Sequence, residues 1–386
     1  MTLIERESCC ATGKSDLEPL YEFPSFPVFM GCVDQPQVED LKQDMSWYIS
    51  RSSGLIQLKK LLPLNILYPE SHGAGTIGLL WATHHKAFAS FVNKSRPSAV
   101  LEIGGSHGIL EKEYHRFGEI PWTILEPNPS PIDECKARFI KGFFDQDFKY
   151  SEEFDTIIHS HVLEHIYEPA EFIKHLSEFM NNGKKLIFSI PNMKSMLDKK
   201  YTNCLDFEHT IFITEPYVEY LLSKYGFKLV GKEYFMDDHS IFYSFVRDRD
   251  VKSIPLPGDL YRKNKAIFMN YVTYYKNLIR HINKYIDESS QPIYVFGAHV
   301  FTQFLLEMGL NTEKVICILD NDTKKQGRRL YGTGLTVDSP KILSVVIKPI
   351  VILNAGVYNK EIRDDIVENI NSDTIFLDGA DVTIGK

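Results

Sequence analysis

The chain has 386 residues, of which 44% are hydrophobic and 24% are charged, an ordinary globular composition. Its net charge of -8 argues against a dedicated nucleic-acid binder, because such proteins carry a basic field. No run of about 18 to 20 apolar residues and no signal-peptide core is present, so we expect a cytoplasmic protein without a membrane partner. The six cysteines show no disulfide framework and are expected to be reduced.

In chain order, residues 1–66 are expected to form an irregular lobe, because prolines punctuate them. Apolar residues at helical spacing predict a helix over about 75–94. Strands are then predicted at 99–103, 122–125, 138–141, 154–158, 185–190, near 234 and at 241–246, with helices at about 168–180 and 215–225. This alternation of strands and helices predicts a parallel sheet covered by helices on both faces, a Rossmann-like α/β domain.

A similar pattern starts again near residue 250. One long helix is predicted over 260–286, and buried strands are predicted at 293–298, 315–320 and 350–354. These elements predict a second, smaller α/β unit. Since about 150 residues make a typical domain, we divide the chain into an N-terminal lobe (1–66), a main domain (67–250) and a C-terminal α/β domain (251–386).

The clearest motif follows the strand at 99–103, where the sequence turns through glycines into a helix. Its informative residues are Glu102, Gly104, Gly105, Ser106 and Gly108. Glycine lets a backbone adopt positive φ and approach a ligand closely. Ser106 stands where the second glycine of the dinucleotide pattern GxGxxG would be, which counts against a nicotinamide oxidoreductase.

Acidic residues follow the next two predicted strands. Glu126 ends the second strand, 24 residues after Glu102, a spacing that fits one βαβ unit. A carboxylate there can accept hydrogen bonds from ribose hydroxyls. Asp145 follows the third strand, where an adenine amino group could be bound. Together with the glycine loop, these residues favour an adenosine-containing cofactor.

Histidines follow the fourth predicted strand, in the segment His159-Ser160-His161-Val162-Leu163-Glu164-His165. The carboxyl ends of parallel strands line the ligand crevice of such sheets. A metal site is one interpretation, but spacing alone rarely defines a ligand set. We expect no metal, and expect His159 and His161 to line the cofactor pocket. The residues expected to face the acceptor are Tyr68, His72, His84, His165 and Asn192.

Taken together, the glycine loop, Glu126, the His-Val-Leu-Glu-His segment and Ile190-Pro191-Asn192 resemble a class I S-adenosylmethionine-dependent methyltransferase. The likeness is closest to the sugar C-methyltransferases of deoxysugar biosynthesis, whose loop is of the type Glu-Ile-Gly-Ser-Asn-Asp-Gly. The resemblance implies S-adenosylmethionine as cofactor, Glu102 near its methionine end, and a C-terminal α/β domain that helps hold a sugar nucleotide. A role in surface-polysaccharide or deoxysugar synthesis is implied by the resemblance only.

Two departures from that family matter. The family begins with a zinc ribbon of paired cysteines, but here only Cys10 remains, while Glu7, Ser50 and Ser53 occupy the other positions. Serine hydroxyls do not replace thiolates in a structural zinc site, so a ribbon-like lobe without zinc is expected.

The second departure concerns the Tyr-x-Glu-His segment that abstracts a proton from carbon in the family. Glu208 and His209 match it, but Asp206 replaces the tyrosine. Deprotonating a hydroxyl needs mainly a base with a pKa near working pH, which histidine supplies. We therefore expect O-methylation with His209 as base, while Glu208 or Asp206 orients it or binds the sugar.

Three alternatives stay open at this point. The chain could be a sugar C-methyltransferase, a methyltransferase-like module that binds ligand without turnover, or a nicotinamide oxidoreductase. The complete glycine loop and Glu126 count against the second, and the missing GxGxxG against the third. The sequence leaves open which sugar is methylated, at which position, and the oligomeric state.

Overall fold

The computed structural model describes residues 3–67 and 78–378. The described chain forms two compact units assembled from separate segments. Unit 1 contains residues 1–18, 48–195 and 208–262, and unit 2 contains residues 19–47, 196–207 and 263–386. The chain therefore passes between the units several times instead of completing one domain before the next. The three consecutive ranges divided at residues 66 and 250 remain a prediction.

Unit 1 is built on a seven-stranded sheet of order β12-β13-β11-β10-β7-β8-β9. The strands are β7 (Val100–Ile103), β8 (Trp122–Glu126), β9 (Arg138–Lys141), β10 (Thr156–Ser160), β11 (Lys185–Pro191), β12 (Phe227–Phe235) and β13 (Ser240–Arg247). All neighbouring strands from β11 to β9 pair in parallel, whereas β13 is antiparallel to both β11 and β12. This confirms the predicted Rossmann-like sheet.

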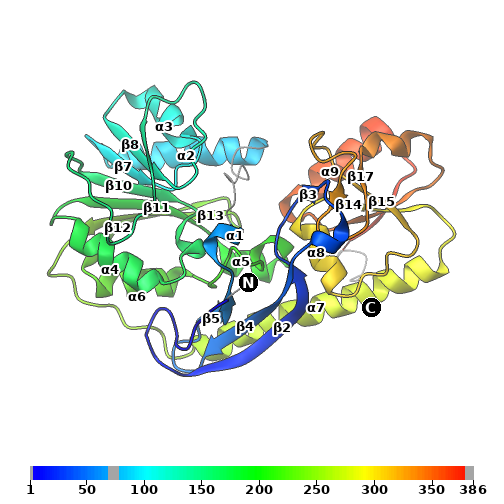
Figure 1. Cartoon of the computed structure of the whole chain (residues 1–386), viewed down its shortest axis with the longest axis horizontal. Helices are drawn as coiled ribbons and strands as arrows, with labels where there is room; N and C mark the ends of the chain where they lie inside the picture. Colours follow the sequence, from blue (N-terminus) through cyan, green and yellow to red (C-terminus); the bar gives the residue numbers. More distant parts are fainter. Residues whose placement is uncertain (1–2, 68–77, 379–386) are drawn as a thin grey trace. The chain divides into compact units, whose positions relative to one another are not determined.

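Helices cover both faces of this sheet (Figure 1). The helices α2 (Leu79–Lys94) and α3 (Ile109–Tyr114) lie on one face, where Phe88 and Val92 pack against β-strand residues such as Ile124. The helices α4 (Pro169–Phe179) and α6 (Glu215–Lys224) lie on the other face and bury Leu176 and Leu221. The two apolar layers hold the sheet rigid, so that the loops at its edges are positioned by a packed core.

The strand order reverses at β7, since β8 and β9 lie on one side of it and β10 and β11 on the other. Ligands of open α/β sheets bind in the crevice at the carboxyl ends of the strands where the order reverses. In unit 1 that point lies between the loop after Ile103 and the loop after Ser160. The glycine motif and the histidine segment therefore face the same crevice.

The N-terminal lobe contains more regular structure than expected. Its strands are β1 (Ile4–Glu5), β2 (Leu17–Pro27), β3 (Cys32–Val33), β4 (Lys42–Ser50), β5 (Ile56–Leu58) and β6 (Lys60–Leu61), with short helix α1 (Leu64–Leu67). The strand β2 contains Pro19, Pro24 and Pro27. The prediction of an irregular chain was wrong here because it rested on these prolines. The strand β2 stands at the edge of a three-stranded sheet, where a missing N–H can face away from the ladder.

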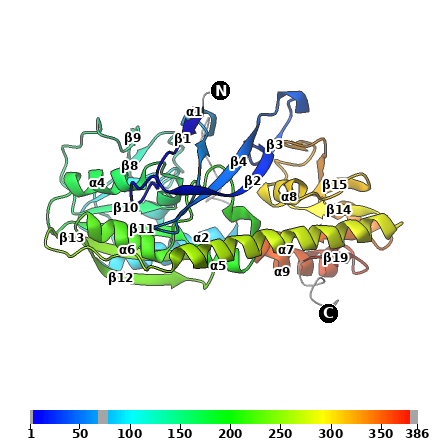
Figure 2. The same ribbon diagram turned by 90° about the horizontal axis from the view of Figure 1, so that it is seen from below.

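Unit 2 confirms the second, smaller α/β unit. Its five strands pair in parallel in the order β17-β15-β14-β18-β19. They are β14 (Ile293–Phe296), β15 (Val315–Leu319), β17 (Val337–Asp338), β18 (Ile350–Leu353) and β19 (Ile375–Leu377), with helices α8 (Val300–Glu307) and α9 (Asn359–Asp365). The helix α7 (Leu260–Glu288) is continuous over 29 residues, as Figure 2 shows, and begins in unit 1.

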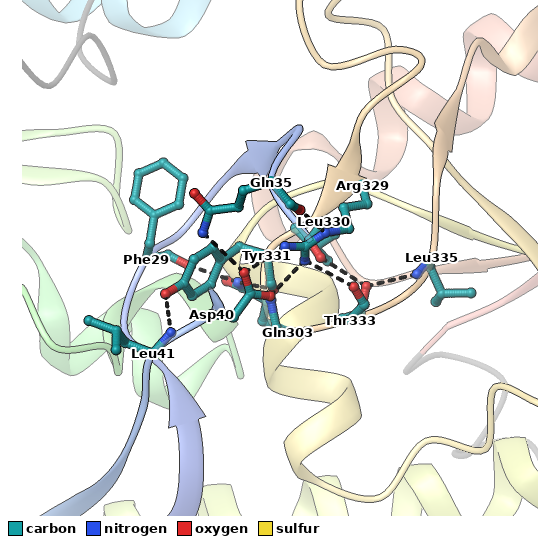
Figure 3. Close-up of polar contacts among 11 residues, drawn as sticks. Phe29, Gln35, Asp40, Leu41, Gln303, Arg329, Leu330, Tyr331, Thr333 and Leu335 are labelled. Atoms are coloured by element: carbon teal, nitrogen blue, oxygen red, sulfur yellow. Dashed lines mark hydrogen bonds and ion pairs between the residues drawn. The ribbon is translucent and has the colours of Figure 1, made fainter. Parts of the chain in front are cut away.

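Unit 2 also joins early and late parts of the chain (Figure 3). The strand β16 (Arg329–Leu330) pairs with β3, and Arg329 forms a two-pronged ion pair with Asp40 at 2.6 Å for both N–O contacts. The Asp40 side chain is only 1% exposed. Burial opposes its charge, but hydrogen bonds from Arg329, Gly332 and Gln35 prevail and lower the pKa of Asp40. Within unit 2, the pair therefore fixes the ribbon of residues 32–40 to the strand β16.

Candidate active site

The glycine loop after β7 is held in a conformation that few other residues could adopt. Gly104 and Gly108 have φ of 74°, and Ser106 has φ of 43°. A Cβ atom on Gly104 would lie 2.7 Å from Cγ2 of Val162, in the loop after β10. The two loops of the crevice thus approach each other closely, and Gly104 is required by both its φ and its surroundings.

Glu102 and Gly105 lie at the base of the same loop. The Glu102 carboxylate is 3% exposed and accepts a hydrogen bond of 2.8 Å from Nε1 of Trp122 on the neighbouring strand. Burial raises the pKa of Glu102 to about 8, against the smaller opposing effect of that hydrogen bond. A Cβ atom on Gly105 would lie 2.8 Å from Cδ of Glu102. Glu102 therefore supports the loop from below as a protonated acid at neutral pH.

Glu126 at the end of β8 contacts the loop directly. One of its oxygens accepts the N–H of Ser106 at 3.1 Å, and the other accepts the N–H of Asn128 at 3.0 Å. Each oxygen of an ionised carboxylate can accept further hydrogen bonds. Glu126 thus orders the glycine loop, and its predicted role as an acceptor for ribose hydroxyls remains a prediction.

Two predicted cofactor residues have clear structural surroundings of their own. Asp145 is exposed, and its Oδ1 accepts the N–H groups of Asp147 and Phe148 at 3.0 and 3.1 Å. His159 is 1% exposed and stacks on Phe188 with ring centroids 4.7 Å apart. Burial lowers the pKa of His159 to about 3, so it is a neutral core residue. Contact of Asp145 and His159 with a cofactor remains a prediction.

His161, by contrast, stands in the crevice with φ of 53°. Its Nδ1 lies 3.2 Å from Oε1 of Glu164, whose side chain is completely buried. Its Nε2 lies 2.9 Å from Oγ of Ser240 at the start of β13. Burial alone would raise the pKa of Glu164, but the hydrogen bond and charge of His161, followed by the charges of His165 and His209, lower it.

The structure adds two partners to His161 that lie far from it in the sequence. His84 on α2 and His239 before β13 each offer a ring nitrogen, and these lie with that of His161 within 4.8 Å of one another. The ring of Trp81 contacts the rings of His84, His161 and His239 at centroid distances of 5.2, 5.0 and 5.1 Å. His239 was not selected from the sequence. Its position before a strand antiparallel to β11 puts it at the carboxyl edge of β11, which was the available signal.

A neighbouring group gathers His165, Glu208 and His209. His165 Nδ1 lies 3.1 Å from the carbonyl oxygen of Glu208, and the rings of His165 and His209 have centroids 5.1 Å apart. The N–H of Thr210 donates to the carbonyl oxygen of Glu164 at 3.2 Å. The segment that carries the predicted base therefore lies against the turn that follows β10.

The other predicted acceptor and catalytic residues are not all gathered there. Asn192 donates from Nδ2 to the carbonyl oxygen of Asp237 at 3.0 Å, and its own N–H donates to the carbonyl oxygen of His239 at 2.9 Å. Asp206 is buried and belongs to unit 2. Tyr68 and His72 lie outside the described residues.

In the N-terminal lobe, the two serines at the positions of the family's zinc ligands form hydrogen bonds with other residues of the lobe. Oγ of Ser53 lies 3.3 Å from Sγ of Cys9, and Oγ of Ser50 donates to Asp16 at 2.7 Å. Burial raises the pKa of Cys10 to about 12, so its thiol is protonated. The absence of zinc from this lobe stays a prediction.

Comparison with known families decides the class of the crevice, since residues 80–232 match the family model described as a methyltransferase domain. The family match is to these residues, fewer than half of the chain. The matched range includes the sheet from β7 to β11, the glycine loop and Glu126. The cofactor of this methyltransferase domain is S-adenosylmethionine. The residues fit such a ligand, because the carboxylate of Glu126 and the glycine loop lie together at the point where the strand order reverses.

Several solved structures are similar to part of this chain. The S-adenosylmethionine-dependent methyltransferase SibL, without ligand, has 17% identity and a TM-score of 0.37, covering 44% of this chain and 56% of SibL. The N-methyltransferase NodS from Bradyrhizobium japonicum has 15% identity and a TM-score of 0.33, covering 44% and 97%. The mitomycin 7-O-methyltransferase MmcR has 17% identity and a TM-score of 0.37, covering 43% and 53%. The match thus spans about half of SibL and of MmcR. No curated protein matches the sequence.

The helices of the described residues were also compared with the requirements of a bilayer. None of them is both long enough and apolar enough to cross a membrane.

Proposed function

We propose that this chain is an S-adenosylmethionine-dependent methyltransferase that O-methylates a sugar, nucleotide-linked or related, in the cytoplasm during surface-polysaccharide synthesis. The observation that carries the proposal is the glycine loop at the strand-order reversal, inside the residues that match a methyltransferase domain. The sugar class is supported by the resemblance of Glu208-His209, and of the C-terminal α/β unit, to the sugar methyltransferases.

When bound, S-adenosylmethionine supplies an electrophilic methyl group to an acceptor oxygen in line with its carbon–sulfur bond. The work of the chain is then to align the acceptor and to remove one proton. Glu126 and the loop it orders hold the cofactor. His209 receives the hydroxyl proton of the acceptor as the new oxygen–carbon bond forms, and the Glu164 carboxylate stabilises the resulting imidazolium.

Asp206 supports O-methylation over C-methylation. Forming a carbanion beside a carbonyl needs a group that stabilises the enolate, a role that suits the tyrosine of the family. Asp206 cannot donate a phenolic hydrogen bond, whereas removal of a hydroxyl proton requires only the base. C-methylation is the alternative outcome, and the site of the new methyl group distinguishes it.

Two measurements test this function. Calorimetric titration with S-adenosylhomocysteine and, separately, with NAD should give binding of the first and none of the second. Incubation with S-adenosylmethionine and a panel of nucleotide sugars should then yield a product one methyl group heavier, with NMR locating that group on oxygen. Binding of S-adenosylhomocysteine without turnover of any member of the panel would favour the non-catalytic module.

A further inference from the structure

The histidines at the carboxyl edge of the unit 1 sheet come from three separate elements. His84 lies on α2, His161 follows β10, and His239 precedes β13. Their ring nitrogens, one from each residue, lie within 4.8 Å of one another. The expectation of no metal compared only histidines that are neighbours in the sequence, so it could not include this group.

We propose that His84, His161 and His239 bind one divalent transition-metal ion of the zinc class and leave one coordination position open for an oxygen ligand. Imidazole nitrogen is a preferred ligand of zinc, copper, iron and nickel ions. Three protein ligands with an open fourth position are the arrangement of catalytic zinc sites, whereas structural zinc sites are closed by four.

The first independent support is an unsatisfied nitrogen on His84. This side chain is 0% exposed, and its Nε2 shares a hydrogen bond of 3.1 Å with Oγ of Ser189. Its Nδ1 has no hydrogen-bond partner among the described residues. A buried polar nitrogen without a partner is costly, and a metal ligand bond would remove that cost.

The second support is the carboxylate behind His161. Metal-binding histidines usually donate their other ring N–H to a carboxylate or carbonyl, which fixes the tautomer. Nδ1 of His161 faces Glu164 at 3.2 Å, which leaves Nε2 as the metal-binding nitrogen. On His239, Nδ1 lies 2.6 Å from Oγ of Ser240, which leaves Nε2 of His239 as its metal-binding nitrogen.

One aromatic side chain packs against all three histidines. The indole of Trp81 packs edge-on against the rings of all three histidines. His84 is buried, whereas His161 and His239 are partly exposed.

Metal binding requires a small rearrangement. Two nitrogens bound to one tetrahedral ion at about 2.05 Å are about 3.4 Å apart, so the rings must move inward from their present limit of 4.8 Å. Nε2 of His161 now lies 2.9 Å from the Ser240 hydroxyl, and this hydrogen bond must break before Nε2 can bind the ion.

The position of the three histidines beside the glycine loop suggests a role for the bound ion. His161 is next to Val162, which closes over Gly104 of the cofactor loop. An ion there would polarise an acceptor oxygen and lower its pKa. This use rests on the proposed function, whereas the binding of metal does not.

The test is direct titration of the full chain after chelator treatment. Co²⁺ binding is followed by visible absorption and Zn²⁺ binding by calorimetry, and one ion per chain is expected. Glu164→Gln should weaken binding about 10- to 100-fold, and His84→Asn or His239→Asn should weaken it more. His281→Asn, which changes an exposed histidine on α7, should bind like wild type. Circular dichroism checks folding, and His239→Asn, in a partly exposed turn, serves if His84→Asn is unfolded.

Absence of stoichiometric binding by the wild type would overturn this inference. So would binding that disappears with His165→Asn or Cys10→Ser but survives His84→Asn and His239→Asn, because the ion would then occupy the neighbouring group or the N-terminal lobe. Titration of the same samples with S-adenosylhomocysteine separates the two proposals. Cofactor binding without metal binding overturns this inference alone, and metal binding without cofactor binding overturns the proposed function alone.

Discussion

At the residue scale, the crevice combines carboxylates that have opposite protonation states. Glu102 is buried with a single donor, Trp122, and keeps its proton near neutral pH. Glu164 is equally buried, but three histidines face it and favour its charged form. The difference follows from the neighbours and not from depth, because both side chains lie out of water. Glu102 lies under the glycine loop, and Glu164 can stabilise positive charge on the histidines that face it.

Replacing Glu126 should weaken the cofactor site. We expect Glu126→Ala to lose about 1–3 kcal/mol of S-adenosylhomocysteine binding, the cost of hydrogen bonds to a charged acceptor. The lost contact with Ser106 also loosens the loop. Calorimetry measures the change, and Glu119→Ala, a surface glutamate paired only with exposed Lys136, is the control. Unchanged affinity in a folded Glu126→Ala protein would remove Glu126 from the site.

Glu102 should make stability depend on pH. Its pKa is about 8 in the folded chain against an ordinary 4.5 in the unfolded chain. Above about pH 4.5 the unfolded chain releases a proton that the folded chain retains, so the free energy of unfolding falls as pH rises towards 8. Glu102→Gln keeps an acceptor for Trp122 and removes this slope. Urea denaturation at several pH values compares the two proteins, and equal slopes would contradict the assignment.

His209 should be needed for turnover and dispensable for cofactor binding. If it accepts the acceptor proton, His209→Asn should cut turnover about 10²- to 10⁴-fold and leave S-adenosylmethionine affinity nearly intact. The exposed variant His281→Asn provides the matched control. Near-normal turnover of His209→Asn with the true acceptor would exclude it as the base, and Asp206 or the histidines around His161 would become the candidates.

At the element scale, most strands and helices could be predicted because local sequence specifies them. The strands β7, β8, β10 and β11 are short apolar runs that end in turns, and the helices α4 and α7 carry apolar stripes at helical spacing. The strand β2 could not be predicted, since its prolines are compatible with a strand only at a sheet edge, and the edge is a property of the folded sheet.

The ion pair that ties β16 to the segment after β3 should be worth more than a surface pair. Removing one partner of a buried ion pair typically costs about 3–5 kcal/mol, because the other charge stays buried. We expect a loss below this range for Asp40→Ala, measured by chemical denaturation, because the charge left behind, Arg329, is partly exposed. The double change of Asp40→Leu with Arg329→Met should recover part of it, and Asp364→Ala, in an exposed pair on α9, should have little effect. A loss for Asp40→Ala no larger than the control would show that the pair contributes little.

At the scale of the whole molecule, the sequence indicated two α/β units but not how the chain is shared between them. The sequence also did not indicate the grouping of His84 with His161 and His239. Each contact joins residues separated by dozens to hundreds of positions, and no local pattern records such a distance. The cofactor loop was predictable because its function and its geometry both reside in a few consecutive residues.

The shared units predict how fragments behave. A fragment of residues 263–386 would lack Phe23 and Trp47, which pack against Phe304 and Phe268 within unit 2. We expect this fragment to show no cooperative thermal transition, because its apolar face is left in water. Circular dichroism of the fragment and the full chain makes the comparison. A fragment that melts cooperatively near the temperature of the full chain would favour the predicted linear division at residue 250.

The partnership of Asp40 and Arg329 also has a consequence during synthesis. The two residues are separated by 289 positions, and ribosomes add about 5–20 residues per second. About 15 to 60 s therefore pass between the synthesis of Asp40 and the synthesis of Arg329. Over that interval unit 1 can complete its sheet, since its last residue is 262, while the ribbon of residues 32–40 still lacks its partner strand β16. Translation speed thus sets how long this ribbon stays open to misassembly with other nascent chains.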